Sequence, residues 1–114
     1  MTFDDVCVLA LAWPGVERST SYGTPALKVK GKLLTRLRED GETLVMLGVG
    51  FDERELLIEA EPEMFHVTPH YRGWPIVLVR LPQANANVVE AFLLRRWREV
   101  APKRLVKEFD AGKG

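Results

Sequence analysis

Residues 26–47 read ALKVKGKLLTRLREDGETLVML: two runs alternate between apolar and polar side chains, and a third run is continuously apolar. Alternation with a period of two is typical of a strand with one buried face, and a short apolar run indicates a more fully buried strand. Gly31 and Gly41 stand between the runs and mark hairpin turns, because glycine adopts the positive φ of tight turns. The segment predicts three antiparallel strands in meander order, with Leu33 and Leu37 on the same face of the second strand.

Helical patterns and two further strands flank this meander. Apolar residues at helical spacing predict helices that begin with an N-capping Thr, Asp or Asn side chain, at residues 2–13, 52–60 and 87–100. Residues 64–68 and 74–81 are predicted strands, and Pro102 either ends the last helix or begins a short final one. The order α-β-β-β-α-β-β-α predicts an α+β fold, with an antiparallel sheet of about five strands and the terminal helices packed on one face.

The composition is that of one globular domain. The chain has 114 residues, of which 46% are hydrophobic and 28% charged, so residues 1–114 are predicted to form a single domain with its own core. Cys7 is the only cysteine, which excludes an internal disulfide and suits a reducing compartment. Residues 1–5 are acidic where a secretory signal is basic, and the apolar stretch 6–13 is shorter than the roughly 20 residues of a membrane span. We therefore expect a cytoplasmic protein.

Motifs for catalysis, metal binding and phosphate loops do not occur in this sequence. Ser19 and Ser21 lack the Gly-x-Ser-x-Gly pattern of a nucleophile elbow, and turn or capping roles explain their hydroxyls. His66 and His70 lie in an extended segment, which predicts rings roughly 13 Å apart, too far for one metal ion. No glycine motif for phosphate loops is present. We predict no enzyme, no metal site and no cofactor.

Two segments carry basic residues in patterns that suit contact with a partner, although the formal net charge is zero. The first set surrounds the first hairpin and comprises Lys28, Lys30, Lys32, Arg36 and Arg38. The second is a basic and aromatic loop with Tyr71, Arg72 and Trp74. A basic two-stranded ribbon can follow phosphates or enter a groove, and aromatic rings can stack on bases, so these residues are candidate nucleic-acid contacts. The alternative is that exposed Lys and Arg side chains keep strands from pairing with other chains.

Several short motifs occur in an order shared with a known family. They are residues 13–17 (WPGVE), 21–29 (SYGTPALKV), 31–34 (GKLL), 67–75 (VTPHYRGWP), 78–81 (LVRL) and 101–105 (APKRL). In order and spacing they resemble the MmcQ/YjbR family, small bacterial proteins labelled DNA-binding, over residues 4–105. The resemblance implies a compact α+β fold grouped with the bacterial frataxin homologue, and a double-wing arrangement that binds DNA.

The two wings implied by this resemblance fall on residues 28–38 and 70–74. The chain departs from the family at the end of the third strand. Many relatives carry a lysine there, whereas residues 46–48 are Met-Leu-Gly. One phosphate contact of the family pattern is therefore missing.

Two other functions fit this sequence. One is a non-enzymatic binding scaffold for a protein or a small anionic ligand, because recognition sites are rich in Tyr, Trp, His and Arg. Its candidate residues are Ser21, Tyr22, Thr24, His70, Tyr71 and Arg72. The other is weak cation binding by the acidic segment 52–63, by analogy with frataxin-like folds.

Overall fold

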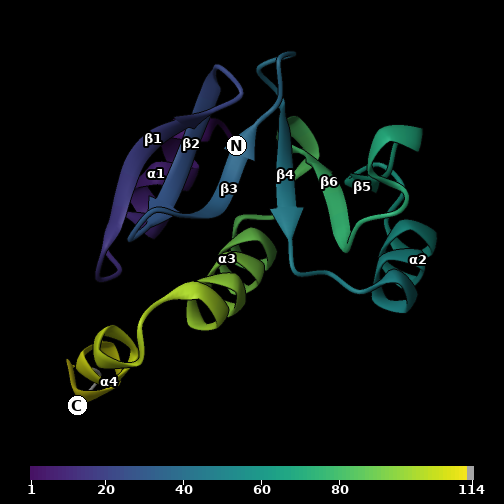
Figure 1. The fold of residues 1–114 in the computed structure, drawn as a ribbon. Coiled ribbons are helices and arrows are strands. Elements are labelled where there is room, and N and C mark those ends of the chain that lie inside the picture. The colour runs from purple at the N-terminus through teal and green to yellow at the C-terminus, as the bar shows by residue number, and fades with distance from the viewer. Residues whose placement is uncertain (113–114) are drawn as a thin grey trace.

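The structure, a computed structural model, describes residues 1–112 (Figure 1). Its helices are α1 (Phe3–Ala10), α2 (Phe51–Ala60), α3 (Ala86–Val100) and α4 (Lys103–Gly112). Its strands are β1 (Val16–Ser21), β2 (Thr24–Val29), β3 (Lys32–Leu37), β4 (Thr43–Leu47), β5 (Phe65–His66) and β6 (Ile76–Arg80). Two 3-10 turns, η1 (Pro69–Tyr71) and η2 (Leu81–Gln83), flank β6. The fold is therefore α+β, as predicted, and the residues after Pro102 form a helix of their own.

The strands form one antiparallel sheet in the order β1-β2-β3-β4-β6-β5, which confirms the antiparallel sheet and its central meander. It has six strands rather than about five, because residues 16–21 (VERSTS) form an edge strand where the sequence suggested a turn. These side chains are almost all polar, so no alternation marks the strand. Tyr22 and Gly23, with φ of 53° and 77°, close the tight hairpin between β1 and β2.

The helix starts agree only partly with the predicted caps. Thr2 caps α1 as predicted, because its hydroxyl accepts a hydrogen bond from the backbone of Asp5. For α2, however, Gly50 is the N-cap and Asp52 lies inside the first turn. For α3 the cap is Asn85, whose side chain accepts from two backbone N–H groups, 2.9 Å and 3.2 Å away. Both helices thus begin before the polar residue that the sequence pattern suggested.

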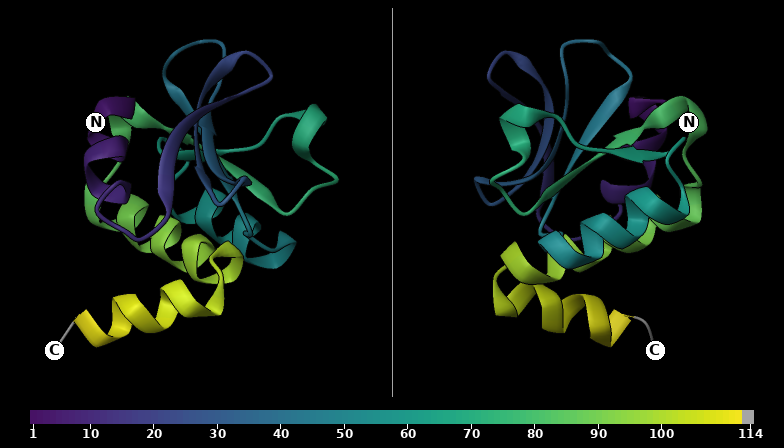
Figure 2. Two further views of the ribbon diagram at one scale, coloured as in Figure 1. Left: turned by 60° about the vertical axis from the view of Figure 1, so that its left-hand side comes forward. Right: turned by 90° about the vertical axis from the view of Figure 1, so that its right-hand side faces the viewer.

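Helices α1 and α3 cover one face of the sheet, and η1 lies on the other (Figure 2). The main core lies beneath these helices, where Val89, Leu93 and Trp97 of α3 are completely buried. Trp97 also donates a hydrogen bond from its indole N–H to the carbonyl of Pro14 at 3.0 Å, and its ring lies 5.1 Å from that of Phe109 in α4. The helices near the two ends of the chain are therefore packed on one face of the sheet, as predicted.

A bulge in β3 decides which side chains reach the outer face, by which we mean the sheet face opposite α1 and α3. The pairing of β2 with β3 shifts by one residue, which leaves Leu34 as an inserted residue. Leu33 therefore faces away from Leu37, and the prediction that they share a face is wrong. Leu37 joins the main core, whereas Leu33 reaches the outer face together with Arg36 and Val45.

Candidate functional site

The outer face of the sheet carries a second, smaller group of buried residues. Tyr71 of η1 packs over Val45 of β4 and Leu78 of β6, and only 7% of Tyr71 is exposed. Its burial is unusual for an aromatic residue in a connecting segment, because loops normally run over the surface. The segment between β5 and β6 is therefore folded down onto the sheet.

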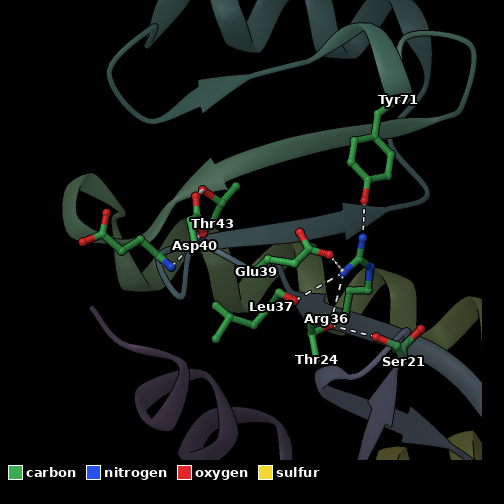
Figure 3. Close-up of polar contacts among 9 residues, drawn as sticks. Ser21, Thr24, Arg36, Leu37, Glu39, Asp40, Thr43 and Tyr71 are labelled. Carbon is green, nitrogen blue, oxygen red and sulfur yellow. Dashed lines mark hydrogen bonds and ion pairs between the residues drawn. The ribbon is translucent and has the colours of Figure 1, made fainter.

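Arg36 lies beneath this segment and is itself buried, with 7% exposed. Its guanidinium donates hydrogen bonds to the Thr24 hydroxyl (3.2 Å), the Leu37 carbonyl (3.4 Å) and the Tyr71 hydroxyl, as Figure 3 shows. The carboxylate of Glu39 is 3.7 Å away, but that side chain is 66% exposed, so water screens the pair. Arg36 thus keeps a largely unneutralised positive charge near the base of the outer face.

A cavity of about 540 Å³ opens beside Arg36. Its walls are mostly aliphatic and aromatic, and they are formed by Tyr22, Leu33, Arg36, Glu39, Val45, Leu47, His70, Tyr71, Trp74 and Ile76. Tyr22 and Trp74 are 90% and 62% exposed, so both rings present their surfaces to solvent. The Arg36 guanidinium lies 5.7 Å from the centre of the Tyr22 ring. Aromatic rings and one buried cation are a combination suited to a planar ligand that carries acceptor atoms.

Arg54 of α2 holds the segment that supplies Tyr71 and Trp74. Its guanidinium, in a residue only 3% exposed, donates hydrogen bonds to the carbonyl oxygens of Arg72 and Trp74 at 2.9 Å and of Ile76 at 3.1 Å, with a longer contact of 3.4 Å to that of Tyr71. A buried charge is costly unless its donors are satisfied, and here backbone carbonyls accept from Nη1 and Nη2, whereas Nε has no partner within residues 1–112. Arg54 therefore fixes the loop through hydrogen bonds to its backbone carbonyls.

Sequence reasoning missed Arg54 because it lies in the acidic run Asp52-Glu53-Arg54-Glu55, where an arginine looks like one more solvated charge. A signal was nevertheless present. Arg54 precedes the half-buried Leu57 and Ile58 by three and four positions, so it lies on the inward stripe of α2.

Comparison with known proteins identifies the family. The YjbR family model matches residues 11–99, which include the whole sheet and most of α3. The chain belongs to the YjbR family. An uncharacterised protein of Mycobacterium bovis and one of Mycobacterium tuberculosis are each 30% identical to it over 105 residues, which cover 90% of this chain and 81% of theirs. No solved structure matches it significantly. Among the helices of residues 1–112, none has the length and apolar character needed to cross a membrane.

In this YjbR chain, part of each predicted wing contributes to the cavity. Arg36 comes from the hairpin, and Tyr71 and Trp74 come from the second loop. Of the residues proposed for a ligand pocket, Tyr22 and His70 also line the cavity, and the His70 and Tyr71 rings meet edge to face at 4.7 Å. The two segments are thus joined at one site on the outer face.

The other predicted residues of the YjbR wings lie outside the cavity. Lys28 is half-buried on β2, and Lys30 and Lys32 are exposed around the β2–β3 turn. The Arg38 guanidinium lies 5.7 Å from the centre of the Tyr71 ring and lines a different pocket. Arg72 is exposed, and its carbonyl accepts from Arg54.

Two further predicted pocket residues act as supports. Thr24 is 7% exposed, accepts a hydrogen bond from Arg36, and donates its own hydroxyl to the carbonyl of Ser21 at 2.8 Å. The chain from Ser21 to Thr24 therefore braces Arg36 from the side of the sheet, and these hydroxyls are not among the groups that line the cavity.

The acidic helix does not gather metal ligands. Within residues 1–112 no three His, Cys, Asp or Glu side chains lie close enough to hold one ion. Glu53 instead accepts two hydrogen bonds from Arg95, at 2.8 Å and 2.9 Å, and this interaction lowers the pKa of Glu53. The geometry therefore adds nothing to the hypothesis of cation binding by α2.

Proposed function

We propose that the protein binds nucleic acid through the outer face of its sheet, where it accepts unpaired bases. One observation carries this proposal: the exposed rings of Tyr22 and Trp74 belong to a cavity that also contains the buried guanidinium of Arg36. Aromatic stacking contributes about 1–3 kcal/mol per base, and every base has a flat face that can use it. The bases of a duplex are already stacked and paired, so this surface favours single strands.

Arg36 suits contact with a base edge better than contact with a phosphate. A guanidinium has five N–H donors, and those of Arg36 make three hydrogen bonds within the protein. The remaining donors can reach an acceptor atom of a base that enters the cavity. The exposed Arg72 and Lys32, and the half-buried Lys28, are then the candidate phosphate contacts.

The formal charge of zero predicts modest affinity with a shallow dependence on salt. About three phosphate contacts on a single strand give a log–log slope of affinity against salt near −2. The hairpin alone, acting as a wing on duplex DNA, predicts a steeper slope and no need for Tyr22 or Trp74. Salt dependence and aromatic dependence together therefore separate the two modes.

The test is a fluorescence-anisotropy titration of a labelled single strand of about ten nucleotides and of the matching duplex, at two salt concentrations. Trp74→Ala and Tyr22→Ala should each weaken single-strand binding about tenfold or more. Because both side chains are exposed, thermal stability should change little. Leu56→Ala is the matched control, since Leu56 is 67% exposed on α2 and does not line the cavity. Binding that is unchanged in Trp74→Ala/Tyr22→Ala would contradict the proposal.

A small planar anion is the second candidate ligand, and the burial of Arg36 favours it. A charge that is 7% exposed inside a cavity is reached more easily by a compact molecule than by a polymer. Calorimetry with guanosine monophosphate and uridine monophosphate distinguishes the candidates. A mononucleotide that binds as tightly as the ten-nucleotide strand indicates a small-ligand site, whereas affinity that rises with strand length supports nucleic-acid binding.

A further inference from the structure

A second, separate pocket lies on the outer face at the other side of Tyr71. Its volume is about 210 Å³. It is lined by Arg38, Asp40, Glu42, Thr43, His66, Arg80, Pro82 and Gln83. These residues come from the β3–β4 turn, from β5, and from the end of β6 with η2. The pairing of Thr43 with Arg80 brings the turn next to the end of β6. Unlike the larger cavity, this pocket is lined mainly by polar and charged side chains.

Both arginines of this pocket are held in place by contacts other than ion pairs, although the charge of Arg38 also acts on the Asp40 carboxylate. Arg38 lies over the Tyr71 ring at 5.7 Å, and Arg80 donates hydrogen bonds to the carbonyls of Pro62 (2.8 Å) and Glu63 (3.5 Å). Among the ion pairs within residues 1–112, none includes Arg38 or Arg80. Their positions are therefore fixed by contacts that leave most of their N–H donors unused.

Two buried polar atoms of residues that line this pocket have no hydrogen-bond partner within residues 1–112. They are Nε of Arg38 and Nδ1 of His66. Buried polar groups are nearly always hydrogen-bonded in folded proteins, and of the five buried side-chain atoms without a partner within residues 1–112, two belong to residues that line this pocket. Both atoms lie beneath the protein surface, so an acceptor-rich ligand in the pocket satisfies them when it draws Arg38 toward it and the imidazole carries a proton on Nδ1.

We propose that Arg38, His66 and Arg80 form a binding site for a phosphate-type oxyanion, either free or as the terminal phosphate of a polynucleotide. Tetrahedral oxyanions offer several acceptor oxygens, and guanidinium groups bind them through short, charge-assisted hydrogen bonds. The site does not depend on the aromatic cavity, since the two share no lining residue.

The imidazole of His66 acts as a reporter of this site. Burial lowers its pKa, the charges of Arg80 and Arg38 lower it further, and Asp40 opposes them. His66 is therefore mainly neutral at pH 7 in the empty pocket. A bound anion favours the charged imidazolium, so the pKa of His66 rises when the site is occupied.

Two carboxylates in the pocket oppose an anion, and they limit its affinity. Asp40 is engaged by its own turn, because it accepts hydrogen bonds from the backbone of Glu42 and Thr43 at 2.9 Å and from the Thr43 hydroxyl at 2.6 Å (Figure 3). Glu42 is exposed, and its carboxylate forms no ion pair within residues 1–112. Removing the charge of Glu42 should therefore tighten binding, which gives the proposal a gain-of-affinity test.

The experiment is an NMR titration of the whole protein with inorganic phosphate, at an ionic strength held constant with sodium chloride. We expect saturable shifts of the His66 ring resonances, with a Kd on the order of 1 mM, and a higher pKa of His66 at saturation. Arg80→Gln and Arg38→Gln should each weaken binding at least fivefold, and Glu42→Gln should strengthen it. Lys103→Gln, which removes one exposed positive charge on α4, is the matched control and should bind like the wild type.

Backbone amide spectra of the variants establish that each is folded before its affinity is compared. A response that does not saturate, that chloride alone reproduces, or that survives Arg80→Gln and Arg38→Gln overturns the proposal. A second arm compares 5′-phosphorylated and unphosphorylated forms of one oligonucleotide. Tighter binding of the phosphorylated form, lost in Arg80→Gln, assigns the site to a terminal phosphate, and a response to inorganic phosphate alone assigns it to the free ion. The titration with inorganic phosphate tests the site at Arg38, His66 and Arg80 even if Trp74→Ala has no effect on nucleic-acid binding.

Discussion

Arg36 of β3 donates a hydrogen bond to the hydroxyl of Tyr71, which lies 35 positions later in the chain. This contact joins the basic hairpin to the aromatic loop. The face of the same ring receives Arg38 at 5.7 Å. Tyr71 therefore separates the aromatic cavity, beside Arg36, from the smaller polar pocket, beside Arg38.

Replacing Tyr71 with Phe should lower stability while keeping the ring that packs over Val45 and Leu78. The change removes the acceptor for a buried guanidinium, and hydrogen bonds to charged groups contribute about 1.5–3 kcal/mol. We expect the free energy of unfolding to fall by about 2 kcal/mol, measured by urea denaturation.

The matched control for that change is Tyr22→Phe. Tyr22 is 90% exposed, and its hydroxyl forms no hydrogen bond within residues 1–112, so its loss should leave the urea midpoint almost unchanged. Equal effects of the two substitutions would show that the Tyr71 hydroxyl does not anchor Arg36.

Arg54→Met should detach the loop between η1 and β6 from α2. The substitution keeps much of the side-chain length but leaves carbonyls of Arg72, Trp74 and Ile76 without their donor. An unsatisfied buried polar group costs about 1–3 kcal/mol. Because water can reach some of these carbonyls in the variant, we expect the free energy of unfolding to fall by about 3 kcal/mol. Hydrogen exchange should accelerate most in residues 71–76.

Arg95→Met is the comparison for Arg54→Met. Arg95 donates two hydrogen bonds to the carboxylate of Glu53, yet its side chain is 44% exposed. An exposed ion pair contributes about 1 kcal/mol or less. A greater loss of stability for Arg95→Met than for Arg54→Met would contradict the role assigned to Arg54.

The sequence was sufficient to predict elements whose burial leaves a local pattern. Strands β2 and β3 alternate, β4 is apolar from Leu44 to Leu47, and the stripe Val89, Leu93 and Trp97 repeats at helical spacing. Strand β1 left no such pattern, because after the buried Val16 its side chains are all polar and are exposed or half-buried. The bulge at Leu34 left none either, since one inserted residue changes which face is buried without changing composition.

The sequence analysis selected some of the residues that line the cavity, but it did not predict their arrangement. Arg36, Tyr71 and Trp74 were chosen for their chemistry, and they do lie together in the cavity. Their meeting depends on the register of β3 with β4 and on the loop that Arg54 holds, which are contacts between distant parts of the chain. No local sequence pattern encodes these contacts. The sequence therefore indicated the exposed Lys30 and Lys32 as candidate nucleic-acid contacts equally with the buried Arg36.

Gly15→Ala should be more destabilising than Gly23→Ala, although both glycines have a φ of 77°. The left-handed conformation costs a non-glycine residue about 1–2 kcal/mol at either position. A Cβ on Gly15 would in addition lie 2.7 Å from Cδ1 of Leu105, whereas nothing lies within 4 Å at Gly23. We expect the clash with Leu105 in Gly15→Ala to displace α4 from the rest of the protein. The indole fluorescence of Trp97, which packs on Phe109 of α4, should therefore change only in that variant. Equal melting temperatures for the two variants would show that the Leu105 side chain moves away from the new Cβ without a cost in stability.

Asp40→Asn should make stability less dependent on pH in acid. Partial burial on its own raises the pKa of Asp40, but hydrogen bonds from the Thr43 hydroxyl and from the backbone of Glu42 and Thr43, together with the charge of Arg38, lower it below its ordinary value. A carboxyl group whose pKa is lower in the folded state stabilises the protein above its unfolded pKa of about 3.9, and that stabilisation is lost as the pH falls through the folded pKa. The wild type should therefore exceed Asp40→Asn in stability at pH 7, and the difference should narrow below about pH 4. Urea titrations at pH 7, 5, 4 and 3 measure this difference in stability between the two proteins. A difference that stays constant over this series would show that the charge of Asp40 is not what stabilises the β3–β4 turn.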